Sequence, residues 1–154
     1  MKVKELMNMD IITVNINAPL REIAEKLLTE KTGCVIVTNN NNDIAGIITP
    51  SDLFRFVFPD YNEIREHGKY FFDSLSIRQR LYEWENIPAS SFMTKFPEVI
   101  NKESPAIEAA AIMKAFKINH LPVTEKGGIV GLITSKDILK SFVLYDLNNI
   151  SIIN

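Results

Sequence analysis

The sequence predicts a mixed α/β (α+β) protein that contains two copies of one β-α-β-β-α unit, with a helical insertion between them. The chain matches itself over two long stretches, and each stretch has the same order of β-prone runs and amphipathic helical patterns. The 154 residues are 46% hydrophobic, which is enough for one good core or for two small cores that share an interface. We therefore expect a compact protein with an internal repeat.

The repeat keeps its register over most of each copy. A polar turn separates two blocks of matching residues, and its length differs by one residue between the copies, a change that surface loops accept. The matching pairs include Met7 with Met93, Pro19 with Pro105, Gly46 with Gly131, and Asp52 with Asp137.

The first strand and the first helix of each copy are predicted because a short β-prone run gives way to apolar residues at helical spacing. Short β-prone runs stand at residues 11–14 and 98–100, and each is followed by a turn that ends in a proline, a residue favoured at helix starts. Apolar residues then recur at helical spacing and predict one inward-facing stripe for each helix. The stripes are Leu20, Ile23, Ala24, Leu27 and Leu28 in the first copy, and Ala106, Ala109, Ala110 and Met113 in the second.

Two buried strands and a second helix complete each copy. Apolar or β-branched runs at 34–37 and 121–124 are followed, across hairpin-like turns, by runs at 44–48 and 129–133. Second helices are expected to begin at Pro50 and Ser135, with apolar residues available for the core. These residues are Leu53, Phe54 and Val57 in the first copy, and Ile138, Leu139 and Phe142 in the second.

The segment between the copies has no counterpart in the repeat and is rich in aromatic residues. Ile77, Leu81 and Trp84 have helical spacing and follow a cap at Asp73 or Ser74. We predict that the aromatic side chains cover the core, and a partner or dimer surface is the alternative. The aromatic residues of this segment are Tyr61, Tyr70, Phe71, Phe72, Tyr82 and Trp84. The predicted divisions are 1–60 for the first copy, 61–86 for the insertion, 87–147 for the second copy and 148–154 for a tail.

Composition argues against several classes of protein. The net charge is only −2, so the chain has no broad field to attract nucleic acid or an acidic membrane. The N-terminus carries charge where a signal peptide needs an apolar core, and no apolar run approaches the roughly 18 residues of a membrane span. A single cysteine, Cys34, excludes an internal disulfide and indicates a reducing compartment. We expect a cytoplasmic protein.

Catalysis and metal binding find little support in the residues. Cys34 lies inside an apolar run without an oxyanion motif, so we interpret it as a small buried hydrophobe and not as a nucleophile. The two histidines are scattered and do not form a metal-ligand cluster. We therefore expect no enzyme activity, no metal and no cofactor.

One motif occurs in both copies at the predicted junction of the last strand and the second helix. The segments Gly46–Asp52 and Gly131–Asp137 have the pattern Gly-apolar-apolar-Thr-x-x-Asp, and Asn119–Val123 precedes the second of them. With the repeat, this pattern resembles a tandem cystathionine-β-synthase (CBS) domain pair, also called a Bateman module. The resemblance covers roughly residues 1–60 and 87–147.

The resemblance implies a fold and a function. It implies two repeats packed through their sheets about a pseudo-twofold axis, two clefts that bind adenosine-containing ligands, and frequent pairing into dimers. Members of the family commonly regulate an enzyme, a channel or a transporter. In that family the Asp of the motif typically binds the ribose hydroxyls and the Thr of the motif lies near the ribose or the phosphate. Residues at the start of the first strand contact the adenine. Carried over to this sequence, the resemblance assigns the ribose contact to Asp52 and Asp137 and the contact near ribose or phosphate to Thr49 and Thr134. It assigns the adenine wall to the stretches Ile12, Thr13, Val14 and Glu98, Val99, Ile100.

The chemistry of these residues agrees with a ribose site and also allows a simpler role. A carboxylate can accept two charge-assisted hydrogen bonds from a vicinal diol, and it repels phosphate, which would turn toward a helix N-terminus or toward His120 or Lys136. Cys34 stands where the second copy has His120, so the two clefts are unequal and we favour the one that His120 can reach. Alternatively, Thr and Asp only cap a helix, and His120 is a surface or interface residue.

Two functions follow from these patterns. The first is a non-catalytic sensor for AMP, ADP, ATP or S-adenosylmethionine that forms homodimers and regulates a separate, unknown effector protein. The second is a ligand-free dimerisation or assembly module with the same fold. Its apolar tail, with Ile150, Ile152 and Ile153, would pack on a partner chain.

Overall fold

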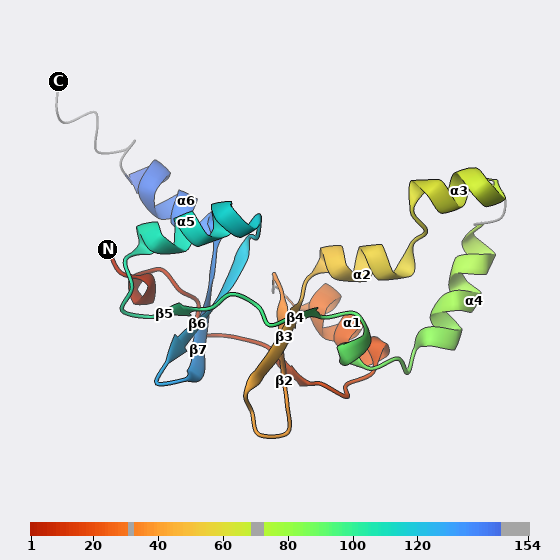
Figure 1. Cartoon of the computed structure of the whole chain (residues 1–154), viewed down its shortest axis with the longest axis horizontal. Coiled ribbons are helices and arrows are strands. Elements are labelled where there is room, and N and C mark those ends of the chain that lie inside the picture. Colours follow the sequence, from red (N-terminus) through yellow and green to blue (C-terminus); the bar gives the residue numbers. More distant parts are fainter. Residues whose placement is uncertain (31–32, 69–72, 146–154) are drawn as a thin grey trace. The chain divides into compact units, whose positions relative to one another are not determined.

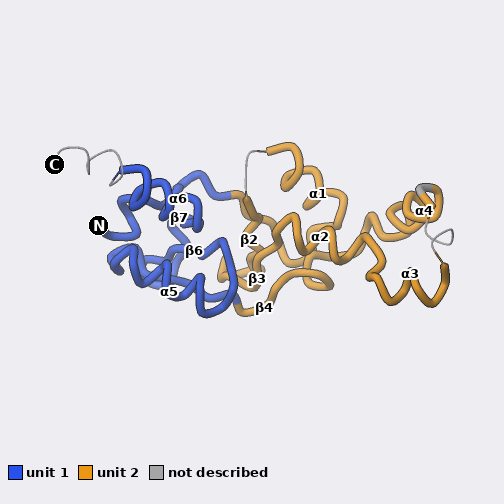
Figure 2. Tube along the Cα trace, turned by 90° about the horizontal axis from the view of Figure 1, so that it is seen from above, with its two compact units in different colours: residues 1–11, 97–154 blue, residues 12–96 orange. Residues whose placement is uncertain are grey.

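The computed structural model describes residues 1–30, 33–68 and 73–145, and these fall into two compact units (Figures 1 and 2). Unit 1 contains residues 1–11 and the chain from residue 97 onward, and unit 2 contains residues 12–96. Each unit has its own cluster of buried apolar side chains. The expectation of a single compact unit is therefore wrong, because the described residues form two units that each have a core. Within the described residues, no helix has both the length and the apolar character that a membrane crossing needs.

Unit 2 holds the body of the first copy. Its sheet has the order β1-β2-β3-β4, where β1 (Thr13–Asn15) lies parallel to β2 (Val35–Thr38) and the other pairs are antiparallel. Strand β3 spans Ile44–Ile48, and β4 spans Thr94–Lys95. The helices α1 (Leu20–Thr29) and α2 (Pro50–Val57) follow β1 and β3 along the chain (Figure 1).

Unit 1 holds the body of the second copy, with the same order of elements. Strand β5 (Ile100–Asn101) is parallel to β6 (His120–Glu125), which pairs antiparallel with β7 (Gly128–Thr134). Helix α5 (Ala106–Phe116) connects β5 to β6, and α6 (Ser135–Leu139) follows β7 and continues as a π-helical turn, Lys140–Leu144. The predicted β-α-β-β-α repeat is confirmed in both copies.

The segments that lead into each copy pack in the other unit. A 3₁₀ helix at Val3–Glu5 belongs to unit 1, and the matching 3₁₀ helix at Ala89–Ser91 belongs to unit 2. Asn8 and Leu132 exchange two backbone hydrogen bonds of 2.8 Å, as β4 does with β3 in unit 2. The open edge of each hairpin is thus paired, which satisfies backbone groups that would otherwise be left at a sheet edge.

Helix burial agrees with the predicted stripes except at three positions. Leu20, Ile23 and Leu27 are buried, whereas Leu28 is 68% exposed because it lies about 100° around the helix from the centre of that stripe. The prediction was also wrong for Phe54 and Leu139, which are exposed. In each case the preceding residue, Leu53 or Ile138, is the one that enters the core.

The insertion forms two helices, α3 (Tyr61–His67) and α4 (Ser74–Trp84). Asp73 caps α4 as predicted, while α3 was not predicted and is capped by Asp60. Trp84 packs against the core of unit 2, with its ring centroid 4.9 Å from that of Phe56. The prediction that the aromatics cover the core is wrong for Tyr61 and Tyr82, which are exposed. Tyr70, Phe71 and Phe72 lie outside the described residues.

Candidate functional site

Each motif forms a helix cap at the end of a buried strand. In α2, Asp52 Oδ2 accepts hydrogen bonds from the Thr49 backbone N–H (2.7 Å) and hydroxyl (2.8 Å). In α6, Asp137 Oδ2 accepts the same pair of hydrogen bonds from Thr134, at 2.9 and 2.6 Å. The threonine hydroxyl in turn accepts from the Asp backbone N–H. The capping role is therefore confirmed in both copies, and it uses one carboxylate oxygen.

The second oxygen of the carboxylate differs between the copies. Asp52 Oδ1 accepts a 2.5 Å hydrogen bond from Nη2 of Arg55, and Asp52 is only 6% exposed. Asp137 is half-buried, and its Oδ1 accepts no hydrogen bond from any residue that the structure describes. Within the described residues, Asp137 is therefore the motif carboxylate that has an oxygen with no hydrogen bond, the state in which it could accept one from a diol.

His120 lies next to the cap in the second copy. It is the first residue of β6 and stands opposite Thr134 in the register of β6 and β7. Its side chain is half-buried, and Lys136 is exposed on the first turn of α6. The structure therefore brings His120, Thr134 and Asp137 together at one end of the β6–β7 pair.

Cys34 occupies the matching place in the first copy and has a different character. It is 1% exposed, and its interpretation as a small buried residue is confirmed. Burial, and to a smaller extent the negative charge of Asp52, raises the pKa of the Cys34 thiol to about 12. A neutral buried thiol cannot serve as a cation for phosphate.

The residues assigned to the adenine wall are only partly accessible. Thr13 and Val99 are exposed, and Ile12 is half-buried. The side chains of Val14 and Ile100 belong to the two cores, so only their backbone atoms are available to a ligand. Glu98 is exposed just before β5.

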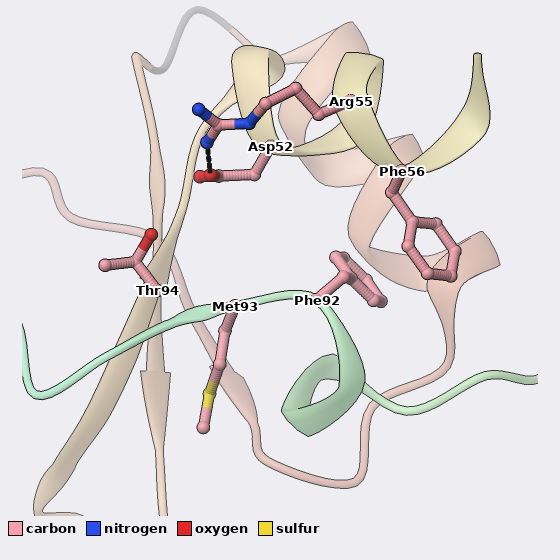
Figure 3. A pocket seen from close by; sticks show the side chains of 6 residues that line it. All are labelled: Asp52, Arg55, Phe56, Phe92, Met93 and Thr94. Atoms are coloured by element: carbon pink, nitrogen blue, oxygen red, sulfur yellow. Dashed lines mark hydrogen bonds and ion pairs between the residues drawn. The ribbon is translucent and has the colours of Figure 1, made fainter. Parts of the chain in front are cut away.

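An open pocket of about 330 Å³ lies beside the first motif, entirely within unit 2 (Figure 3). Sequence reasoning identified Asp52 and missed the other side chains that line the pocket. One signal for Arg55 was available, because residues three apart on a helix face one another. The lining residues are Asp52, Arg55, Phe56, Phe92, Met93 and Thr94.

The motif glycines allow a close approach of the leading segments. A Cβ atom added to Gly46 would lie 2.6 Å from Met93 Sδ and 2.8 Å from the Thr94 carbonyl oxygen. One added to Gly131 would lie 2.9 Å from both Met7 Sδ and the Asn8 carbonyl oxygen. The repeat of Met7 and Met93 in the sequence thus reflects the same packing in both units.

Among the described residues, no group of three or more histidine, cysteine, aspartate or glutamate side chains is placed to hold a metal ion.

Comparison with known proteins identifies the fold family of both copies. The model of the CBS domain matches residues 3–59 and 89–144. A CBS domain-containing protein of Dictyostelium discoideum is 30% identical over 142 residues, which cover 89% of this chain and 88% of the relative. Inosine-5'-monophosphate dehydrogenase of Aquifex aeolicus is 31% identical over 132 residues, which cover 84% of this chain and 22% of that enzyme.

Solved structures give the same result. The CBS domain of a membrane protein from Sphaerobacter thermophilus has a TM-score of 0.74 at 26% identity, covering 94% of this chain and 89% of that one. CBSX2 in complex with AMP has a TM-score of 0.70 at 16% identity, with coverages of 94% and 98%. The CBS domain pair of MJ0100, in complex with 5'-methylthioadenosine and S-adenosyl-L-methionine, has a TM-score of 0.67 at 21% identity, with coverages of 92% and 95%. This chain belongs to the CBS domain family and is a tandem CBS domain pair, a Bateman module.

Proposed function

We propose that this chain is a non-catalytic regulatory module that binds an adenosyl ligand through Asp137. The observation that carries the proposal is the second oxygen of this carboxylate, which accepts no bond from the described residues while the first oxygen is held by Thr134. A carboxylate fixed by its cap is preorganised to accept hydrogen bonds from the ribose diol. The complexes of related folds with AMP and with S-adenosyl-L-methionine support this class of ligand.

The neighbouring residues suggest how the remainder of the ligand would be held. His120 stands opposite Thr134 in the strand register and Lys136 lies on the first turn of α6, so both could donate hydrogen bonds to a phosphate or to the carboxylate of S-adenosylmethionine. The exposed residue Val99 offers apolar surface to the adenine. We further propose that the protein is cytoplasmic, forms homodimers and passes its signal to a separate effector protein. The expectation that a ligand spans both repeats stays a prediction.

The test is isothermal titration of nucleotide-stripped protein with AMP, ADP, ATP and S-adenosylmethionine. Asp137→Asn keeps the shape of the side chain and an oxygen for the cap, but it removes the charge from the diol acceptor. We expect a loss of roughly tenfold or more in affinity, with little change in melting temperature. An unaltered affinity would contradict the assignment of Asp137.

The second candidate function is a ligand-free assembly module. It is favoured by one observation, the exposed and mutually packed pair of Phe54 and Phe58, whose ring centroids lie 4.9 Å apart on unit 2. The apolar tail that the sequence assigned to this role lies outside the described residues. Absence of heat and of a thermal shift with all four ligands, from a folded sample, would favour this candidate, because a ligand that binds the native state raises the melting temperature.

A further inference from the structure

We propose that Arg55 blocks the carboxylate of Asp52 by bonding to it. Each chain would then bind one adenosyl ligand tightly, at Asp137, and would bind a second ligand at Asp52 only weakly. This inference rests on the proposed function and specifies how many ligands bind and where. It makes Arg55 the residue that determines the affinity of the first-copy site.

Both oxygens of Asp52 are already engaged, so a diol would have to compete with the residues that hold them. One oxygen is held by the backbone N–H and the hydroxyl of Thr49, and the other by the guanidinium of Arg55. The carboxylate is also buried, and Arg55 lines the same pocket as Asp52. Figure 3 shows the Arg55 side chain folded from α2 back onto the carboxylate.

The second copy lacks this closure. Lys140 stands where the first copy has Arg55, three residues after the motif Asp, and it makes no ion pair with Asp137 among the described contacts. An arginine presents a planar fork that matches a carboxylate, whereas a lysine presents a strongly hydrated point charge. The two copies therefore differ at this position in whether a cation closes the motif carboxylate, and in this proposal that difference decides which carboxylate accepts a ligand.

The closure is reversible. The Arg55 side chain is 73% exposed, so it can swing into solvent without breaking any packing of the core. A ligand must nevertheless replace a charge-assisted hydrogen bond to a buried carboxylate before it can bind. We therefore expect the first site to bind at least about tenfold more weakly than the second, and to fill only at high ligand concentration.

Removal of Arg55 would open Asp52 onto space that already exists. The pocket of about 330 Å³ beside the pair is walled by the apolar side chains of Phe56, Phe92 and Met93. An aromatic base suits such a wall, because offset or edge-to-face contacts with phenylalanine rings are favourable. The variant is thus expected to gain a binding site, a result that simple damage to the protein cannot produce.

The experiment is titration calorimetry of the full chain with the ligand that binds the wild type most tightly. Wild type should bind one equivalent, and Arg55→Ala should bind a second, which Asp52→Asn removes when it is combined with Arg55→Ala. Arg55→Met, which keeps an unbranched stem but has no donor for the carboxylate, should give the same gain. Arg65→Ala on α3 removes the same charge from an exposed position and should leave one equivalent.

The outcomes separate this inference from the proposed function. One equivalent in both wild type and Arg55→Ala would overturn the inference and leave the proposed function standing. Two equal sites in wild type, or loss of the single site in Asp52→Asn, would do the same. No binding to any variant would overturn the proposed function and the inference together.

Discussion

Two glycines contribute no side chain to the candidate sites, yet they allow a neighbouring segment of backbone to pack closely against the strand. Gly46 in β3 and Gly131 in β7 lie under the leading segments, each of which carries a methionine. A side chain here would meet a backbone carbonyl, which cannot turn away as the methionine can. The glycine of the motif is therefore a packing requirement of the sheet as well as a signature of the family.

Gly46→Ala should lower the free energy of unfolding by about 1–3 kcal/mol, because the added methyl group overpacks the contact between β3 and β4. Urea unfolding followed by circular dichroism would measure this loss of unfolding free energy. Gly128→Ala is the matched control, since the nearest atom to its added Cβ is 3.7 Å away, and its effect should stay within about 0.5 kcal/mol. Equal effects of the two substitutions would contradict this account.

Residue-scale chemistry was predictable where it is local. The spacing of Thr49 and Asp52 is that of a capping box, and the structure has that cap in both copies. The burial of Cys34 followed from its apolar neighbours. The closure by Arg55 was not predicted, because helical spacing allows the pair but does not decide whether an exposed arginine bonds its carboxylate or extends into solvent.

At the scale of elements, the insertion is held to unit 2 by a short stack of aromatic rings. Phe56 lies between Trp84 and Phe92, with ring centroids at 4.9 and 5.0 Å. The Arg80 guanidinium covers the Trp84 ring at 5.1 Å. Helix α2 therefore connects the motif at its N-terminus with the insertion through Phe56.

Phe56→Ala should destabilise the protein by roughly 2 kcal/mol, because it removes two ring contacts and leaves a gap under α4. Trp84 is the only tryptophan in the chain, so its fluorescence should shift to longer wavelength as the ring becomes hydrated. Phe54→Ala, on an exposed face of the same helix, should leave the emission maximum unchanged. An unchanged emission maximum in Phe56→Ala would contradict the role of the stack in holding the insertion.

Element prediction succeeded where apolar periodicity was long and failed where another signal was needed. The stripes of α1 and α5 were visible because several residues repeat at helical spacing. Helix α3 has no buried residue, so periodicity could not reveal it. Its signal was the capping box formed by Asp60, directly before the helix, and Glu63 in its first turn.

At the scale of the whole molecule, residues 1–11 are anchored by both packing and charge. Val3 is fully buried in the core of unit 1, and Glu103 accepts hydrogen bonds from Lys2 and Lys4, each at 2.8 Å. These bonds, first from Lys2 and then from Lys4, lower the pKa of the Glu103 carboxyl to about 2. The charged form of Glu103 is therefore the one that holds the segment.

Glu103→Gln should loosen residues 1–11 near neutral pH, and the difference from wild type should shrink as the pH falls. Because the pKa is lower in the folded state than the ordinary 4.5, the contribution is complete above about pH 4.5 and is lost as the pH falls through about 2. Hydrogen exchange of the Val3 and Lys4 amides, which bond to Ser104 and Lys102, would measure it.

A matched control is Glu108→Gln on the first turn of α5, a residue that makes no ion pair with Lys2 or Lys4. It should leave the Val3 amide as protected as in wild type at every pH. A pH-independent difference between Glu103→Gln and wild type would mean that the charge of Glu103 does not anchor the segment.

The assignment of segments to units could not be predicted from the repeat. Local patterns determined each strand and helix, but the pairing of Asn8 with Leu132 joins residues that lie far apart in the chain. The repeat suggested that Val3 belongs with the copy that follows it, whereas Val3 packs with Leu121 and Ile133 in the core of unit 1. Such pairings depend on which sheet edge has unpaired backbone groups. That edge forms only when the chain folds, so the local sequence pattern does not reveal it.

The exchange of leading segments has a consequence for how such a chain could arise. A polypeptide with a single copy would have an uncovered edge at its motif glycine, and two such polypeptides would complete each other by domain swapping. Joining the copies in one chain makes that exchange intramolecular, so it is governed by the effective concentration that the linker provides. Each repeat would then receive its covering segment from the same chain, and a repeat cut out at the ends of its own copy would lose that segment.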